Sequence, residues 1–153
     1  MKKIIILLEG DPQQSREIKT AIERYFSQVE IEVIETEKGF RESIASIAAS
    51  EDHLCLVIAD TAIRWAFPER DGPNAPADVK EGTHRGAGIR CWQLLRQQNN
   101  LSHVSWIYFT TLSMKAMEFA SYSDWRTGYV EKGFSIKPLI EEMMARTLVP
   151  VKF

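Results

Sequence analysis

Apolar residues follow two patterns along the chain: short uninterrupted runs, and longer segments in which they recur every three or four positions. The runs predict β-strands, and the three-to-four spacing predicts helices that bury one face. The predicted strands cover residues 4–8, 31–34, 54–59, 104–109 and 129–130, and the predicted helices cover residues 12–26, 40–48, 89–98, 114–120 and 136–144. Because strands that alternate with helices are joined by right-handed crossovers, the pattern predicts an α/β protein with a doubly wound, five-stranded, mostly parallel sheet.

The sequence also predicts which parts of these elements are buried. Residues 4–8 and 54–59 are apolar throughout, which is typical of strands covered on both faces, whereas residues 31–34 alternate with glutamate like a half-exposed edge strand. Asp11 can cap the first helix, with Pro12 at its first position. The predicted buried helix faces contain Ile18, Ala21, Ile22, Tyr25 and Phe26 in the first helix, Phe40, Ile44, Ile47 and Ala48 in the second, and Ile136, Leu139, Ile140, Met143 and Met144 in the last.

One segment interrupts the regular alternation. Residues 64–86 contain three of the six prolines and three of the eight glycines, among charges of both signs. This composition predicts a long loop inserted into a single domain of residues 1–153, and loops of about 20 residues within compact domains are usually functional or mobile. Trp65 and Trp92 are predicted to be packing anchors.

Composition and charge exclude several classes of protein. With 44% hydrophobic and 26% charged residues the chain reads as an ordinary soluble domain, and a net charge of −2 gives no general attraction for nucleic acid or a membrane surface. The first apolar run is too short for a signal peptide or a membrane span. Cys55 and Cys91 have no CxxC spacing, which predicts reduced thiols and a cytoplasmic protein. The three histidines are too far apart in sequence to suggest a zinc site.

Polar residues stand at the carboxyl ends of four predicted strands, where parallel sheets place their working sites. They are Glu9-Gly10-Asp11, Asp60-Thr61, Thr110-Thr111 and Glu131-Lys132. Carboxylates from neighbouring strands can hold Mg²⁺, and a carboxylate can act as a nucleophile towards phosphorus while a hydroxyl and a lysine stabilise the developing charge. The set therefore suits phosphoryl transfer onto Asp60.

These residues and their order resemble the receiver domains of two-component response regulators. In that family two acids close strand 1 ahead of a proline, as in Leu8-Glu9-Gly10-Asp11-Pro12, and the phosphoacceptor aspartate closes strand 3, at Asp60. The resemblance implies that Thr110 is the switch hydroxyl, that Lys132 is the site lysine and that Tyr129 is a switch aromatic. It also implies a flavodoxin-like (βα)5 fold with strand order 2-1-3-4-5. The Mg²⁺ ligands would be Glu9, Asp11, Asp60 and the backbone carbonyl of Ala62.

Two positions depart from the family pattern. Gly10 stands where the family has a second acid that contacts the metal, so Mg²⁺ binding is expected to be weak. Gly133 replaces the usual proline after the lysine, which frees the following loop. In addition, Ala62 and Leu112 flank the path of the attacking water in the resembling family, and neither side chain can hydrogen-bond that water. A phosphorylated state is therefore expected to decay slowly.

The sequence thus predicts a stand-alone response regulator in a two-component phosphorelay rather than an enzyme, beyond its own phosphorylation and dephosphorylation. Its partners would be a histidine kinase or phosphotransfer protein and a downstream protein target. Output, and a possible homodimer, would use helix 4, strand 5 and helix 5. One alternative is a degenerate receiver that acts as a phosphate-independent interaction module, which Gly10 favours. The other is a flavodoxin-like enzyme or nucleotide binder, although neither GxGxxG nor GxxxxGK[ST] follows the first strand.

Each site residue also has a simpler interpretation. Asp60 could cap the following loop, Thr110 could be present for its β-propensity, Lys132 could be a solvated surface charge, Tyr129 could be a core residue, and Asp11 could serve only as a helix cap.

Overall fold

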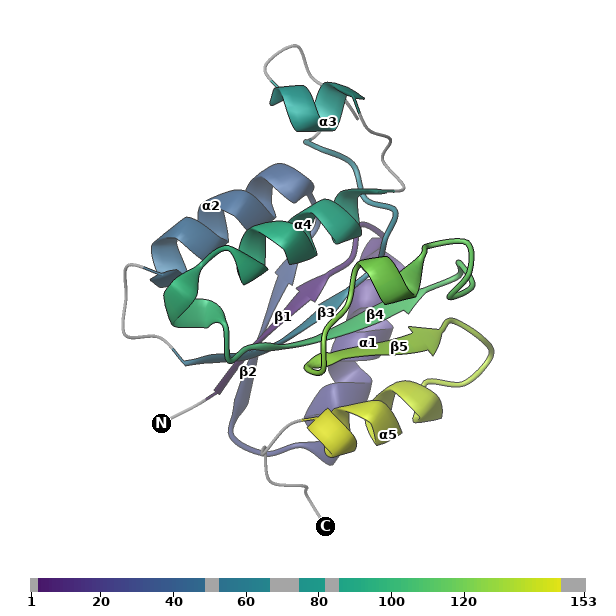
Figure 1. The fold of residues 1–153 in the computed structure, drawn as a ribbon. Helices are drawn as coiled ribbons and strands as arrows, with labels where there is room; N and C mark the ends of the chain where they lie inside the picture. The colour runs from purple at the N-terminus through teal and green to yellow at the C-terminus, as the bar shows by residue number, and fades with distance from the viewer. Residues whose placement is uncertain (1–2, 49–52, 67–74, 82–85, 147–153) are drawn as a thin grey trace.

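A single parallel sheet forms the centre of the protein (Figure 1). The computed structural model describes residues 3–48, 53–66, 75–81 and 86–146. Its strands are β1 (Lys3–Leu8), β2 (Val29–Ile34), β3 (Leu54–Ala59), β4 (Ser105–Thr110) and β5 (Thr127–Glu131), and they lie in the order β2-β1-β3-β4-β5 with parallel pairing throughout. The predicted α/β class, sheet and strand order are confirmed.

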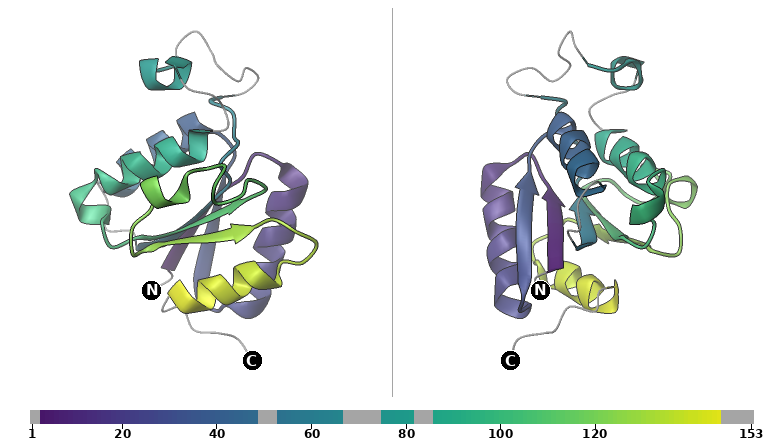
Figure 2. Two further views of the ribbon diagram at one scale, coloured as in Figure 1. Left: turned by 45° about the vertical axis from the view of Figure 1, so that its right-hand side comes forward. Right: turned by 90° about the vertical axis from the view of Figure 1, so that its left-hand side faces the viewer.

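Helices cover both faces of the sheet (Figure 2). The described helices are α1 (Pro12–Tyr25), α2 (Glu37–Ala48), α3 (Ala77–Glu81), α4 (Ala87–Arg96) and α5 (Lys137–Arg146). Ile18 of α1 and Leu139 of α5 pack in one apolar core with Ile5 of β1, whereas Phe40 of α2 and Cys91 of α4 belong to the core on the opposite face. Alternate residues of each central strand thus enter different cores, which explains the uninterrupted apolar runs.

The strands differ in exposure as their sequences predict. All six residues of β4 are buried, and β1 and β3 are buried over most of their length. In β2, an edge strand, Glu30 and Glu32 are exposed, while Ile31 and Ile34 are buried. The polar alternation in β2 therefore marks the edge of the sheet.

The helix predicted for residues 114–120 is wrong. The chain forms turns there and one short 3₁₀ helix, Phe119–Ser121. Met117 packs in the core and Phe119 packs against it, a spacing of two that one helix face cannot provide. Between them Glu118 has a left-handed backbone, with φ of 55°. Tertiary packing thus overrides a weak helical pattern.

The prediction of an unbroken loop over residues 64–86 is also wrong, because α3 lies within it. Trp65, Ala75 and Val79 bury their side chains together in a small core of their own. Trp65 is therefore a packing anchor, as predicted. The rest of this predicted loop, residues 67–74 and 82–85, lies outside the described residues. We call the described part, residues 64–66 and 75–81, the insertion.

Two residues predicted to lie on buried helix faces are exposed instead, Tyr25 in α1 and Met144 in α5. Tyr25 is the last residue of its helix, and the neighbouring Phe26 fills the core in its place. In α5, Met143 is buried in the core, and the neighbouring Met144 points to the surface. Among the described helices, none has the length and apolar character needed to cross a membrane.

Candidate functional site

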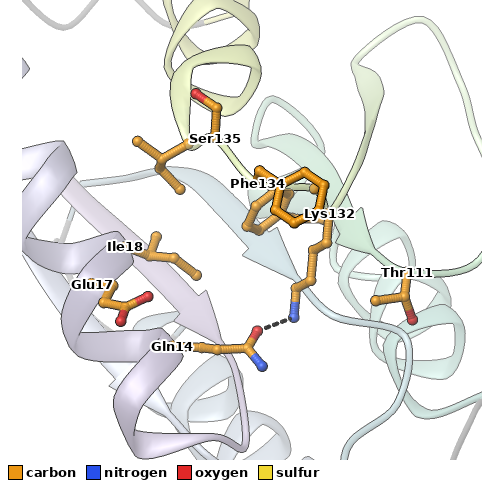
Figure 3. A pocket seen from close by; sticks show the side chains of 10 residues that line it. Gln14, Glu17, Ile18, Thr111, Lys132, Phe134 and Ser135 are labelled. Carbon is orange, nitrogen blue, oxygen red and sulfur yellow. Dashed lines mark hydrogen bonds between the residues drawn. The ribbon is translucent and has the colours of Figure 1, made fainter.

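Four strands deliver polar side chains to one end of the sheet. Glu9 follows β1, Asp60 follows β3, Thr110 ends β4 and Lys132 follows β5. Two hollows open there, each with a volume of about 530 Å³. The lysine groove (Figure 3) is lined by Gln14, Glu17, Ile18, Phe109, Thr111, Lys132, Gly133, Phe134, Ser135 and Ile136. The carboxylate cleft is lined by Glu9, Gly10, Asp11, Pro12, Gln14, Asp60, Ala62, Ile63 and Arg64.

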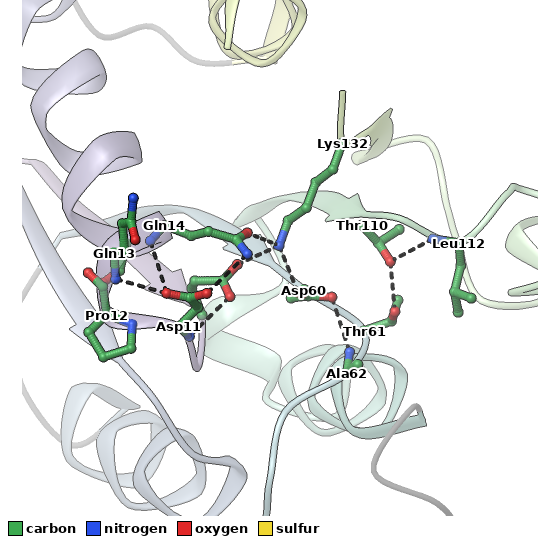
Figure 4. Close-up of polar contacts among 12 residues, drawn as sticks. Asp11, Pro12, Gln13, Gln14, Asp60, Thr61, Ala62, Thr110, Leu112 and Lys132 are labelled. Atoms are coloured by element: carbon green, nitrogen blue, oxygen red, sulfur yellow. Dashed lines mark hydrogen bonds and ion pairs between the residues drawn. The ribbon is translucent and has the colours of Figure 1, made fainter. Parts of the chain in front are cut away.

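The ammonium group of Lys132 is the centre of the polar contacts (Figure 4). Its Nζ donates to Asp60 Oδ2 and to Glu9 Oε2, each at 2.7 Å. It also donates to Gln14 Oε1 at 2.8 Å, so each of its three protons has an acceptor. Lys132 therefore connects the ends of β1 and β3 to α1, and its charge neutralises one of the two carboxylates. It is not a solvated surface lysine.

Burial changes the acid–base properties of this group. Burial raises the pKa of Glu9 above its ordinary value, and Lys132 offsets this only in part. For Lys132, burial alone would lower the pKa, but the charges and acceptors of Asp60 and Glu9 outweigh it and raise the pKa. Lys132 is therefore protonated at neutral pH.

Asp11 caps helix α1. Its Oδ1 accepts hydrogen bonds from Gln13 N at 2.8 Å and from Gln14 N at 3.2 Å, and these bonds lower the pKa of the carboxyl group. The predicted cap is confirmed. Asp11 N donates to Glu9 Oε1 at 3.2 Å, which fixes the second oxygen of Glu9 at the cleft.

Thr110 is fully buried at the end of β4, whereas the neighbouring Thr111 is exposed and lines the lysine groove. Thr110 Oγ1 lies 2.8 Å from the Oγ1 of Thr61, the residue that follows Asp60 in the sequence. Thr110 Oγ1 also accepts a hydrogen bond from Leu112 N at 3.1 Å. Leu112 O in turn accepts a hydrogen bond from the Tyr129 hydroxyl. The predicted switch pair, Thr110 and Tyr129, is thus connected through the backbone of Leu112.

The sequence pattern does not reveal the roles of three residues that shape the site, although it includes Thr61 among the strand-end residues. Gln14 resembles the other polar residues on a helix surface, and Thr61 stands out only as part of a strand end. Gly88 donates its N–H to Thr61 O at 3.1 Å, and a Cβ at this position would lie 2.3 Å from Asp60 O. Glycine is required there because α4 approaches the backbone of Asp60 closely, which no local sequence pattern reveals.

A divalent cation would find a sparse set of oxygen ligands here. Within the described ranges no group of three or more acidic, histidine or cysteine side chains could hold a metal ion. Glu9 and Asp60 face one another across Lys132, Gly10 supplies no carboxylate, and Asp11 is engaged with α1. Two carboxylates are nevertheless enough for a Mg²⁺ ion that keeps several waters and shares a phosphate oxygen, so the residues fit a weakly bound ion.

Solved structures of receiver domains share this fold. The phosphorylated cyanobacterial phytochrome response regulator RcpA superposes with a TM-score of 0.68 at 15% identity, covering 98% of this chain and 99% of its own. A signal receiver domain of a two-component histidine kinase from Clostridium thermocellum gives 0.66 at 15% identity, over 95% and 97% of the two chains. Chemotaxis protein CheY4 of Vibrio cholerae gives 0.63 at 14% identity, over 96% and 100%. No family model and no curated protein matches the sequence. The chain therefore has the receiver-domain fold.

Proposed function

We propose that this chain is a phosphoacceptor signalling domain in which Asp60 receives a phosphoryl group. The observation that carries the proposal is the contact of the Lys132 ammonium with Asp60 Oδ2, at 2.7 Å and at the carboxyl edge of the sheet. Thr110 and Thr61 place two hydroxyl groups at the same edge, the second directly after Asp60. A nucleophile, a cation and hydroxyl donors thus converge from separate strands, on a fold whose solved examples are signalling receiver domains.

The proposed chemistry needs few groups. An oxygen of Asp60 forms a bond to the phosphorus of a phosphohistidine, the P–N bond breaks, and the departing imidazole nitrogen takes a proton from solvent. The negative charge that develops on the phosphoryl oxygens is met by the Lys132 ammonium, which already contacts Asp60, and the Thr110 hydroxyl would turn from Thr61 to add a hydrogen bond. Glu9 and Asp60 would hold Mg²⁺, which would supply further positive charge to the same oxygens.

The proposed donor is a histidine kinase or phosphotransfer protein, and the proposed location is the cytoplasm. The support is the receiver-domain fold together with Cys91, which is a buried free thiol. The predicted output face consists of the predicted fourth helix (residues 114–120), the fifth strand and the last helix. Because no α-helix forms in the described residues 111–126, such a face would have to use β5, α5 and the turns at residues 111–126. A homodimer through that face stays a prediction.

One experiment tests the proposed function directly. The protein is incubated with Mg²⁺ and acetyl phosphate, and intact mass is measured. We expect a gain of one phosphoryl group that is lost in Asp60→Asn. Glu141→Gln is the control, since Glu141 is an exposed acid of α5 that does not line the cleft, and it should retain the gain. A gain that persists in Asp60→Asn would contradict the proposal.

A second candidate is a phosphate-independent interaction module. It is favoured by Gly10, which supplies no carboxylate to the cleft. In that case the parent protein would show no mass gain, even with high Mg²⁺.

A further inference from the structure

Gln14 lies where the two hollows of the site meet. It lines both the carboxylate cleft and the lysine groove, and its side chain is half-buried on the first turn of α1. Its Oε1 accepts the hydrogen bond from Lys132 Nζ at 2.8 Å (Figure 3), and its Nε2 donates to Asp11 Oδ2 at 3.3 Å. The side-chain amide is therefore held at both ends, by the helix cap and by the lysine.

We propose that Gln14 is a positioning residue for Lys132, an inference that rests on the proposed function. The ammonium has three protons, and Gln14 and Glu9 accept two of them. The third N–H then donates to Asp60 Oδ2. When a phosphoryl group arrives, this N–H can donate to a phosphoryl oxygen instead. Donors that are already aimed at the developing charge need no reorganisation when the reaction takes place.

The neutral amide of Gln14 suits this task better than a carboxylate would. The site already contains the carboxyl groups of Glu9, Asp11 and Asp60 around one lysine. A further anion would hold the ammonium equally well but would repel a phosphodonor that is itself negatively charged. Gln14 thus orients Lys132 without adding to the negative charge of the cleft.

The adjacent glutamine provides a matched control. Gln13 lies on the same helical turn, but its side chain is exposed and donates to Glu17 Oε1 at 3.3 Å instead of accepting from Lys132. Replacing either glutamine by leucine removes one amide of the same size from α1. Only Gln14→Leu removes an acceptor from Lys132.

The test measures the rate of phosphorylation against acetyl phosphate concentration for the parent, Gln14→Leu, Gln14→Glu and Gln13→Leu. For Gln14→Leu we expect a maximal rate lower by about tenfold with the KM for donor unchanged, as for loss of a hydrogen bond to a charged group. Gln14→Glu keeps the acceptor, so it should keep the maximal rate and raise the KM. Gln13→Leu should match the parent in both.

The outcomes separate this inference from the proposed function. A parent protein that takes up no phosphoryl group would contradict the proposed function itself. A reactive parent with equal maximal rates in Gln14→Leu and Gln13→Leu would overturn the role of Gln14. Loss of maximal rate in Gln14→Glu would overturn it as well, because that variant retains the acceptor for Lys132.

Discussion

Gly10 supplies no carboxylate to the cleft at the position between Glu9 and Asp11. A Cβ at this position would lie 3.4 Å from Glu35 O and 3.9 Å from Ile63 Cγ2, which are ordinary contacts. A Cβ is therefore accommodated at position 10 without displacing the backbone. We predict that Gly10→Asp binds Mg²⁺ about tenfold more tightly than the parent, because it adds an acid that is not engaged with α1, as Asp11 is, to Glu9 and Asp60 at the cleft. Isothermal titration with Mg²⁺ measures the difference.

The control for this variant adds the same charge elsewhere. A Cβ on Gly133 would have no atom within 4 Å, and this residue lines the lysine groove rather than the carboxylate cleft. Gly133→Asp should leave Mg²⁺ affinity near that of the parent. Equal tightening in both variants would mean that net charge, rather than a ligand at position 10, is responsible.

Ala62 and Leu112 bear on the lifetime of a phosphorylated Asp60. Ala62 is exposed after Asp60, and the buried Thr110 contacts Thr61 next to Asp60, so we take Thr110 as the proposed switch hydroxyl and Leu112 as the second flanking residue. Neither side chain can orient a water, and such help is typically worth about 10²–10⁴-fold. We predict slow loss of the phosphoryl group, accelerated by Ala62→Asn or Leu112→Glu. The decay of phosphoprotein after removal of donor is the measurement, and fast decay in the parent that neither variant accelerates would refute it.

At the scale of whole elements, α4 is joined to β3 by a contact that only glycine allows. A methyl group on Gly88 would lie 2.3 Å from Asp60 O and 2.9 Å from Thr61 Cα, both of them backbone atoms. We predict that Gly88→Ala lowers the free energy of unfolding by about 1–3 kcal/mol, as overpacking does. Urea denaturation measures it. Gly133→Ala, where nothing lies within 4 Å, should change stability far less.

A second inter-element contact is sensitive to pH. Burial alone would raise the pKa of Asp124, but hydrogen bonds from Arg96 and Thr127 outweigh it and hold the pKa below its ordinary value of 3.8. The ion pair with Arg96 of α4, at 2.6 Å, therefore contributes stability above this pH and loses it as Asp124 takes up a proton at lower pH.

We accordingly predict that Asp124→Asn is less stable than the parent at neutral pH, by about 1 kcal/mol after solvent screening. The difference should shrink as pH falls below 3.8. Urea denaturation at a series of pH values checks it. Glu141→Gln, which loses an exposed pair with Lys137 at 4.0 Å, serves as control and should show little difference at any pH. A pH-independent deficit in Asp124→Asn would contradict the ionic explanation.

The elements with strong local signals are predictable from the sequence, and those set by long-range packing are not. Continuous apolar runs locate β1 and β3, and a cap followed by proline locates α1. The strand-end residues Asp60 and Lys132 are likewise predictable because topology alone brings parallel strand ends together. Gln14 and Gly88 give no such signal because their roles depend on partners far away in the chain. The turns around Met117 replace a predicted helix for the same reason.

On the scale of the whole molecule, an ionic cluster fastens the insertion to the body of the domain. The fully buried Glu37 accepts hydrogen bonds from Arg41 and Arg90, at 2.9 and 2.8 Å, and so connects α2 with α4. Arg41 also binds Asp78 of α3 at 2.7 Å, and its guanidinium lies 5.2 Å from the ring centroid of Trp65. One arginine thus joins α2 to both parts of the insertion.

We predict that Arg41→Met releases this attachment while the sheet stays folded. Trp65 is only 8% exposed, so its release should shift tryptophan fluorescence to longer wavelength without loss of the β-sheet signal in circular dichroism. Arg126→Met is the matched control. It removes a similar stacking contact, at 4.0 Å, from Trp125, which is already 78% exposed. An unshifted spectrum in Arg41→Met would show that Trp65 and Val79 pack stably without the arginine.

The hydrogen bond from Gly88 N to Thr61 O has a consequence for how this architecture tolerates variation in length. The chain leaves the sheet at Thr61 and returns to within 3.1 Å of the same peptide group, so the closure point is fixed whatever lies between. The entropy of closing such an excursion grows only logarithmically, at about 0.6 kcal/mol for each doubling of its length. A longer excursion between Thr61 and Gly88 therefore adds little to the entropy of closure.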